Sequence, residues 1–124
     1  MPRTAVVFFA ESDGSCPVLQ WLDGLPSKVQ DKCVVRVERL QQLGHELRRP
    51  EADILRDGIH ELRVRYGNVN YRLLYFFHKG IAVISHGLKK EATVAERQIE
   101  LAVARKNSFA RNPLLHTYEE AGNG

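Results

Sequence analysis

The stretch Gly58-Ile-His-Glu-Leu-Arg-Val-Arg-Tyr-Gly-Asn-Val-Asn-Tyr-Arg72 alternates apolar and polar residues on both sides of a Gly-Asn pair. Alternation with a period of two is typical of a β-strand with one buried face, and Gly-Asn is typical of a tight turn. We therefore expect a hairpin with strands at Ile59–Arg65 and Val69–His78. A third run, Ile81–His86, follows a Lys-Gly turn and extends the hairpin into an antiparallel meander.

The rest of the chain is predicted to add one strand and three helices. Residues 4–9 are β-branched and aromatic, which favours a strand. The helices are expected to begin at the cap residues Ser15, Ser27 and Thr93, and the last two to end near Gly44 and Ala110. The spacings Ser27–Gln30 and Thr93–Glu96 match a capping box, in which two side chains cap the helix reciprocally.

The predicted order of elements is β-α-α-β-β-β-α, which is typical of an α+β fold. Two N-terminal helices would pack on a small, antiparallel-rich sheet of about four strands. The polar segment His45–Asp57 contains Pro50 and is predicted to be a connecting loop. Residues 1–113 are expected to form a single domain, and residues 114–124, which end in Gly-Asn-Gly, a flexible C-terminal tail.

Composition favours a small domain in a reducing compartment. The chain has 124 residues, is 44% hydrophobic and carries a net charge of +3 with a pI near 9.0, which permits nucleic acid as a partner. Its two cysteines, Cys16 and Cys33, stand in no metal-binding pattern, so neither a metal nor another cofactor is expected. The apolar run Ala5–Ala10 is too short for a signal peptide or a membrane span, so we expect no membrane association and a cytoplasmic location.

Three arginines on the first two meander strands raise the question of a ligand. Glu61, Arg63 and Arg65 share one face of their strand, and the turn brings them level with Arg72 on the next. One interpretation is an ion pair between Arg72 and Glu61 that stabilises the sheet. The other is a phosphate clamp, because the planar guanidinium group suits phosphate.

Two further features follow the third meander strand. Lys89-Lys90 precede the last predicted helix, and phosphate can bind where cations meet a helix N-terminus. His86 ends the strand and belongs to the residue type that titrates near neutrality. A strand-end histidine bonded to the backbone is an equally good interpretation.

These residues together resemble the RelE/ParE toxin superfamily, in its phage-derived, HigB-like branch. The resemblance is carried by Leu55-x-x-Gly58-Ile-x-Glu-Leu-Arg-Val-Arg65, Tyr71-Arg-x-Leu-Tyr75, His86-Gly-x-Lys-Lys90 and Ile99-Glu-x-Ala102. It implies a RelE-like fold and a type II toxin that cleaves mRNA on the ribosome without a metal. It also implies a helix-turn-helix antitoxin as the neutralising partner.

The resemblance also implies roles for individual residues. Arg63 and Arg72 would bind the scissile phosphate, and Lys90 matches a basic position that contacts substrate. Additional RNA contacts would come from Arg65, Lys89 and Tyr71. RelE carries a tyrosine in the segment that here runs from Glu91 to Gln98 without any aromatic residue, so His86 becomes the leading candidate for the general base.

Two alternatives use the same fold. A ParE-like protein poisons DNA gyrase and needs no catalytic cations, whereas this chain has Arg63, Arg72 and Lys90. A non-catalytic binding module or inactive relic would agree with the missing tyrosine.

Overall fold

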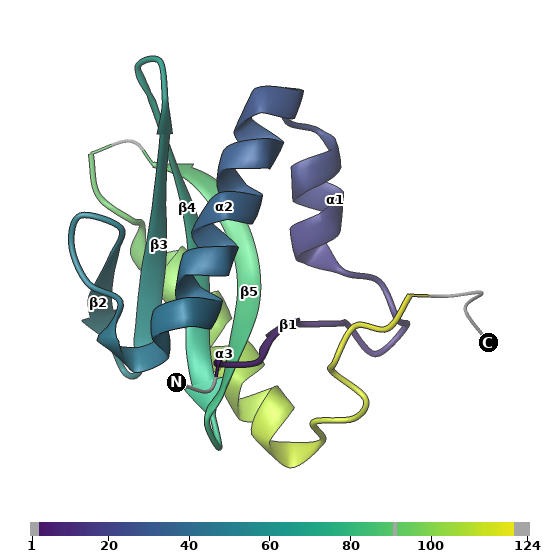
Figure 1. Cartoon of the computed structure of the whole chain (residues 1–124). Coiled ribbons are helices and arrows are strands. Elements are labelled where there is room, and N and C mark those ends of the chain that lie inside the picture. The colour runs from purple at the N-terminus through teal and green to yellow at the C-terminus, as the bar shows by residue number, and fades with distance from the viewer. Residues whose placement is uncertain (1–2, 91, 121–124) are drawn as a thin grey trace.

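The computed structural model describes residues 3–90 and 92–120, which form three α-helices and one five-stranded sheet (Figure 1). In chain order the elements are β1 (Val6–Phe8), α1 (Pro17–Asp23), α2 (Ser27–Leu43), the 3-10 turn η1 (Gly44–Glu46), β2 (Ala52–Arg56), β3 (Ile59–Tyr66), β4 (Val69–His78), β5 (Ile81–Lys90) and α3 (Glu96–Arg111). No helix within the described ranges is both long and apolar enough to cross a membrane.

The strand order in the sheet is β1-β5-β4-β3-β2, with β4 at the centre. Strand β1 runs parallel to β5, and every other neighbouring pair is antiparallel. Helices α1 and α2 cover one face of the sheet and α3 lies on the other (Figure 1). The predicted α+β class and order of elements are therefore confirmed, with β2 as one additional strand.

Each face of the sheet has its own hydrophobic core, as the alternation along β3 requires. Leu62 and Val64 point toward α1 and α2, where Cys33 is also buried, as expected from its helical position. Ile59 points the other way, into a core that includes Phe76 and residues of α3. The central strand β4 is buried on both faces over residues 71–76, which explains why its sequence is apolar on both sides.

The predicted loop His45–Asp57 contains strand β2, so this prediction is wrong for residues 52–56. Ala52 pairs with Leu62 and Ile54 with His60, and a register shift follows before Arg56. The strand is short, lies at the edge of the sheet and leaves Ile54 49% exposed. It therefore lacks the strongly apolar alternation that identified its neighbours.

The predicted helix caps are also wrong. The residues flanking the helices are Cys16, Pro26 and Ala95, and none of them caps its helix with a side chain. The Gln30 side chain donates to the carbonyl of Leu22 at 2.7 Å and so links α2 to α1, which explains why it serves no capping box. At the other end of α2, Gly44 stops the helix with φ of 54°, as predicted.

The C-terminal segment lies against β1 as far as Tyr118, although a flexible tail was expected from residue 114. Tyr118 donates its backbone N–H to Phe8, and Thr117 forms a β-bridge with Phe9. His116 is buried, stacks on the Phe9 ring and binds the carbonyl of Ala10 at 2.7 Å. The last four residues of the expected tail lie outside the described residues.

Trp21 on α1 packs directly on the backbone of β5. A Cβ atom at Gly87 would overlap the Trp21 ring, so only glycine allows helix and strand to come this close. Trp21 also makes an edge contact with Tyr71 on β4, with ring centroids 6.2 Å apart. This contact fixes α1 on the sheet.

We predict that Gly87→Ala lowers the free energy of unfolding by roughly 1–3 kcal/mol, because the added methyl group forces Trp21 away from the sheet. Urea denaturation followed by tryptophan fluorescence measures the loss. Gly24→Ala is the matched control, since its new Cβ would meet only an ordinary contact at 3.6 Å. Equal stability of the two variants would contradict the close packing of α1 on β5.

Candidate functional site

The register of the strands brings four of the predicted cations to one face of the sheet. Arg63 lies directly opposite Arg72, and Arg65 lies opposite Asn70. On the other side of β4, Asn70 lies opposite Lys90. Residues in such rows share a face, so Arg63, Arg65, Arg72 and Lys90 gather near the β3–β4 turn. We call these four residues the cation cluster.

A buried carboxylate holds two members of the cluster. Glu61 is only 3% exposed and accepts from Arg72 Nε at 3.1 Å through one oxygen and from Arg63 Nε at 3.0 Å through the other. Arg63 Nη2 also lies 3.2 Å from Asp53, which pairs in turn with Arg49 at 2.7 Å. The predicted Arg72–Glu61 ion pair is therefore present. It is one link in a row of five alternating charges, which we call the charge chain: Arg49, Asp53, Arg63, Glu61 and Arg72.

This arrangement leaves donors on both guanidinium groups for a ligand. Glu61 engages the Nε atoms of Arg63 and Arg72, which lie at the base of the planar fork. Arg72 Nη1 donates to the carbonyl of Tyr71 at 3.0 Å, and burial lowers the pKa of Arg72 from its ordinary value. Arginine stays charged at neutral pH despite such a shift. Three cations and two carboxylates in the chain leave a formal net charge of +1.

The arginines of the cluster face a cavity of about 320 Å³. Its lining comprises Arg36, Pro50, Arg63, Val64, Arg65, Asn70 and Arg72. None of these described lining residues carries a carboxylate or an imidazole. The cavity is therefore suited to an anion, and phosphate or carboxylate matches the fork of arginine. Nowhere in residues 3–90 and 92–120 do three His, Cys, Asp or Glu side chains form a group that could hold a metal ion.

Two predicted RNA-binding residues lie apart from the cluster. Tyr71 and Lys89 are opposite each other in the β4–β5 pair, on the face that α1 and α2 cover. Tyr71 is buried against Trp21, and Lys89 is exposed. The structure therefore separates this pair from the cation cluster by the thickness of the sheet.

Strand β5 is longer than predicted and contains a bulge. It runs to Lys90, so the prediction that it ends at His86 is wrong, and the lysines belong to the strand. Leu74 pairs with His86 while Tyr75 pairs with Ile84, which leaves Ser85 as an extra residue. Helix α3 begins only at Glu96, so its N-terminus does not directly follow the lysines.

His86 lies on the face of the sheet that α3 covers. It is opposite Leu74, in the row of residues next to the row of Arg63 and Arg72. Its Nδ1 is 2.7 Å from the hydroxyl of Ser85 and its Nε2 is 2.9 Å from Oε1 of Gln98. Burial, with a smaller effect of Arg105, lowers the pKa of His86 to about 4. The ring is thus neutral at pH 7, and both nitrogens are engaged.

Sequence reasoning missed Asp53, Arg49 and Arg36 as parts of this site. Asp53 lies opposite Glu61 in the β2–β3 pair, so it joins the charge chain only because residues 52–56 form a strand. Arg36 reaches the cavity from α2. Only the short run Ala52-Asp-Ile54 alternates in this segment, which is too weak a signal to predict an edge strand.

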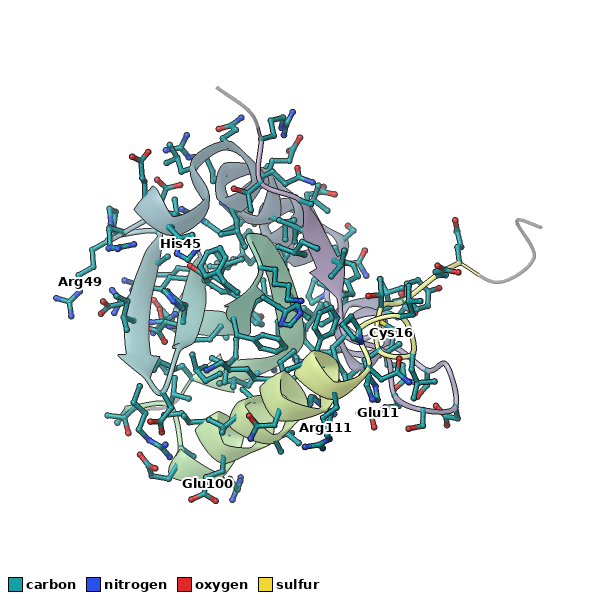
Figure 2. All side chains as sticks on the ribbon, turned by 90° about the horizontal axis from the view of Figure 1, so that it is seen from below. Glu11, Cys16, His45, Arg49, Glu100 and Arg111 are labelled. Atoms are coloured by element: carbon teal, nitrogen blue, oxygen red, sulfur yellow. The ribbon has the colours of Figure 1, made fainter. Side chains whose placement is uncertain are left out.

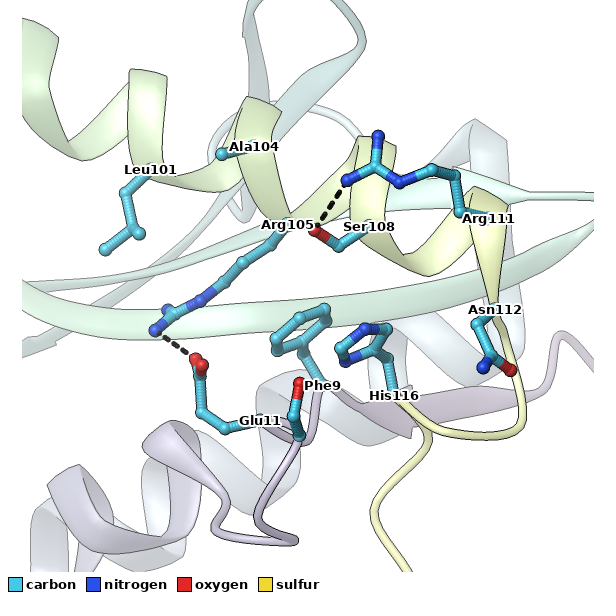
Figure 3. A pocket seen from close by; sticks show the side chains of 10 residues that line it. Phe9, Glu11, Leu101, Ala104, Arg105, Ser108, Arg111, Asn112 and His116 are labelled. Atoms are coloured by element: carbon cyan, nitrogen blue, oxygen red, sulfur yellow. Dashed lines mark hydrogen bonds and ion pairs between the residues drawn. The ribbon is translucent and has the colours of Figure 1, made fainter.

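A larger cavity, of about 520 Å³, lies along the C-terminal half of α3 (Figure 3). Arg105 there pairs with Glu11 at 2.8 Å, and its guanidinium carbon lies 5.4 Å from the centre of the Phe9 ring. These contacts hold α3 to the end of β1. Figure 2 shows Glu11 at the opposite side of the molecule from Arg49, which belongs to the charge chain. The larger cavity is therefore separate from the cation cluster.

A family model described as phage derived protein Gp49-like (DUF891) matches residues 20–107. The matched range contains α2, the whole meander, the cation cluster and most of α3. No curated protein matches the chain.

We predict that Glu61→Ala lowers the free energy of unfolding by roughly 3–5 kcal/mol, because it leaves two arginines, one of them buried, without their shared carboxylate. Asp53→Ala is the matched control: Asp53 is 24% exposed and should lose only about 1 kcal/mol. Urea denaturation of the purified variants measures both. A loss for Glu61→Ala no greater than that for Asp53→Ala would contradict the bridging role.

We also predict that acid destabilises the fold through two histidines, the buried His86 and the half-buried His60. Burial lowers the pKa values of His86 and His60 to about 4, whereas the unfolded chain binds the proton near 6.5. Stability is therefore complete above pH 6.5 and decreases as the pH falls toward 4. Between pH 7 and 5 each histidine should contribute a loss of about 2 kcal/mol.

Urea denaturation across this pH range tests the assignment, because most carboxylates titrate at lower pH. His86→Gln should retain about half of the slope, since His60 still contributes. A variant with the full slope of the wild type would show that His86 is not the titrating group.

Proposed function

Because the chain belongs to the Gp49-like family of phage-derived proteins, a RelE-like, toxin-like family of toxin–antitoxin systems, we propose that it is a toxin that cleaves mRNA. In this proposal it is a ribosome-dependent, metal-independent endonuclease of the HigB-like branch. It acts in the cytoplasm, and a helix-turn-helix antitoxin neutralises it. The observation that carries the proposal is the position of Arg63 directly opposite Arg72 in the sheet, beside a cavity that four arginines line.

Metal-independent cleavage of RNA demands a site that stabilises negative charge. The 2′-oxygen attacks the neighbouring phosphorus, a base takes the 2′-hydroxyl proton, and the bond to the 5′-oxygen breaks as that oxygen receives a proton. The products are a 2′,3′-cyclic phosphate and a 5′-hydroxyl. Arg63 and Arg72 would bind the non-bridging oxygens, whose charge grows in the transition state.

Lys90 and Arg65 extend this function from the neighbouring row. Both side chains lie on the same face of the sheet as Arg63 and Arg72. Arg65 on β3 and Lys90 on β5 are the two neighbours of Asn70 on β4. An ammonium group carries protons, so Lys90 suits the protonation of the leaving 5′-oxygen. Arg65, which is exposed, suits contact with an adjacent phosphate.

The cavity supplies cations but, among its described lining residues, no general base. We assign His86 to the packing of α3 through Gln98 rather than to proton transfer, because both ring nitrogens are engaged. Tyr71 is similarly assigned to packing on Trp21, and Lys89 to RNA contacts outside the cluster. In this proposal the 2′-hydroxyl proton therefore passes to water or to a group of the ribosome, and the site contributes charge stabilisation to a substrate that arrives already oriented. Dependence on the ribosome provides that orientation.

We predict that induced expression in a bacterium arrests growth and creates new mRNA 5′ ends in the translational reading frame. Arg63→Ala and Lys90→Ala should reduce cleavage by roughly 10²–10³-fold, the usual cost of removing one group that stabilises the transition state. Arg72→Lys should have a similar effect while it keeps a cation beside Glu61. Mapping of 5′ ends and growth curves provide the measurement.

Lys79→Ala is the control, because Lys79 is exposed in the turn at the far end of β4 and should leave cleavage intact. Thermal denaturation confirms that each variant is folded. Growth arrest without new mRNA ends would refute the endonuclease and indicate another target, such as gyrase. A folded wild type without any growth arrest would favour a non-catalytic binding module.

A further inference from the structure

A second cavity joins that of the cation cluster at the outer edge of β3. It has a volume of about 240 Å³, and Asp31, Lys32 and Val35 line it from α2. The two cavities share three lining residues, Arg36, Val64 and Arg65. A groove therefore runs from the cation cluster across the edge of β3 to α2, which packs alongside that strand (Figure 1). We call it the edge groove.

The edge of β3 is open at this point because β2 is shorter than β3. The last residue pair between these strands is Ala52 with Leu62, and Arg63 donates its N–H to Glu51 just beyond it. Within the described part of the chain, no strand pairs with the outer edge of residues 64–66. Since alternate residues of a strand direct their N–H groups to the same side, the N–H of Arg65 faces the open edge.

The cations of the edge groove are only partly engaged by the protein. Lys32 is exposed and makes no ion pair with the residues that the structure describes. Arg65 donates only to the carbonyl of Gly67, at 3.3 Å, in the same part of the chain. Arg36 pairs through Nη1 with Glu51 at 2.9 Å, while its buried Nε has no partner among the described residues.

Lining and position together indicate what the groove binds. The lining of the second cavity carries three cations and one carboxylate. The cations are Lys32, Arg36 and Arg65, of which the last two also line the first cavity, and the carboxylate is Asp31. The exposed side chain of Val35 adds an apolar surface between the charges. Regularly spaced negative charges joined by flat apolar groups are the chemistry of single-stranded nucleic acid. An acidic peptide would match this groove less well, because the groove is continuous with a cavity in which several arginine forks face one place.

We infer that the edge groove binds nucleotides that flank the scissile phosphate, so that the RNA strand crosses the edge of β3 and continues along α2. This inference rests on the proposed endonuclease. The guanidinium group of Arg65 binds the phosphate next to the scissile one, and the backbone N–H of Arg65, which faces the open edge, is a second donor. Lys32 and Arg36 bind the phosphates farther along. The contribution of α2 is therefore affinity for a longer strand.

Two oligonucleotides test this path. The probes are a 2′-O-methyl trinucleotide and a 2′-O-methyl octanucleotide, which cannot be cleaved because the attacking hydroxyl is blocked. Fluorescence anisotropy gives their affinities at several salt concentrations. The wild type should bind the octanucleotide more tightly and with a steeper salt dependence, since each neutralised phosphate adds about 0.7 to the slope for a single strand.

Lys32→Glu is the diagnostic variant, because Lys32 is exposed on α2 and lies outside the charge chain around Glu61. It should reduce the gain in affinity from trinucleotide to octanucleotide by about fivefold or more and lower the salt slope by about 0.7. Lys79→Glu makes the same change of charge at the opposite end of β4 and should retain the whole gain.

The possible outcomes separate this inference from the proposed function. If the wild type cleaves mRNA in cells but Lys32→Glu and Lys79→Glu bind the octanucleotide equally, the edge groove is not the RNA path and the endonuclease stands. Equal affinity of the wild type for both probes would overturn the inference in the same way. If the wild type neither cleaves mRNA nor binds either probe, the proposed function itself fails.

Discussion

The carboxylate of Glu61 is the interaction on which the rest of the site depends. It is buried between β3 and β4 and joins Arg63 to Arg72 through their Nε atoms. Without it, two guanidinium groups directly opposite each other in the sheet would repel across a partly buried interface. With it, one outer nitrogen of each guanidinium group, Nη1 of Arg63 and Nη2 of Arg72, has no partner among the described residues, and both side chains line the cavity. The ion-pair and phosphate-clamp interpretations are therefore compatible, since one carboxylate permits both.

The position of the site follows from where the hydrophobic core under α3 ends. On one face of β3 and β4, the rows change along the strands from Ile59 and Phe76 to Glu61 and Leu74, and then to Arg63 and Arg72. Helix α3 covers the apolar rows and leaves the cationic row outside its core. Burial of the neighbouring row keeps the arginines in a rigid sheet, which is the support that an oriented phosphate site requires.

The sequence predicted this face but not everything that completes it. Alternation along β3 and β4 was sufficient to place Arg63, Arg65 and Arg72 together, because neither strand contains an irregularity between these positions. In β5 the extra residue Ser85 reverses which side chains face α3, and as a result Lys90 rather than Lys89 joins the cluster. A bulge of this kind depends on packing between strands and leaves no local pattern in the sequence. Asp53 was missed for a related reason, since an edge strand with an exposed Ile54 resembles a loop.

The shortness of β2 has a consequence beyond the fold. An unpaired strand edge usually exposes a protein to unwanted pairing, and charged side chains are a common protection. Here Arg65 stands at that edge, Arg63 directly precedes it and Arg36 approaches it from α2, so the same charges that discourage an added β-strand are suited to bind phosphate. A strand of RNA is long, whereas the cavity of about 320 Å³ has room for only a small part of it. In the proposed endonuclease, the open edge would give the remainder of the strand a charged path, and a site with charge but no base of its own would gain most from a substrate held along its length.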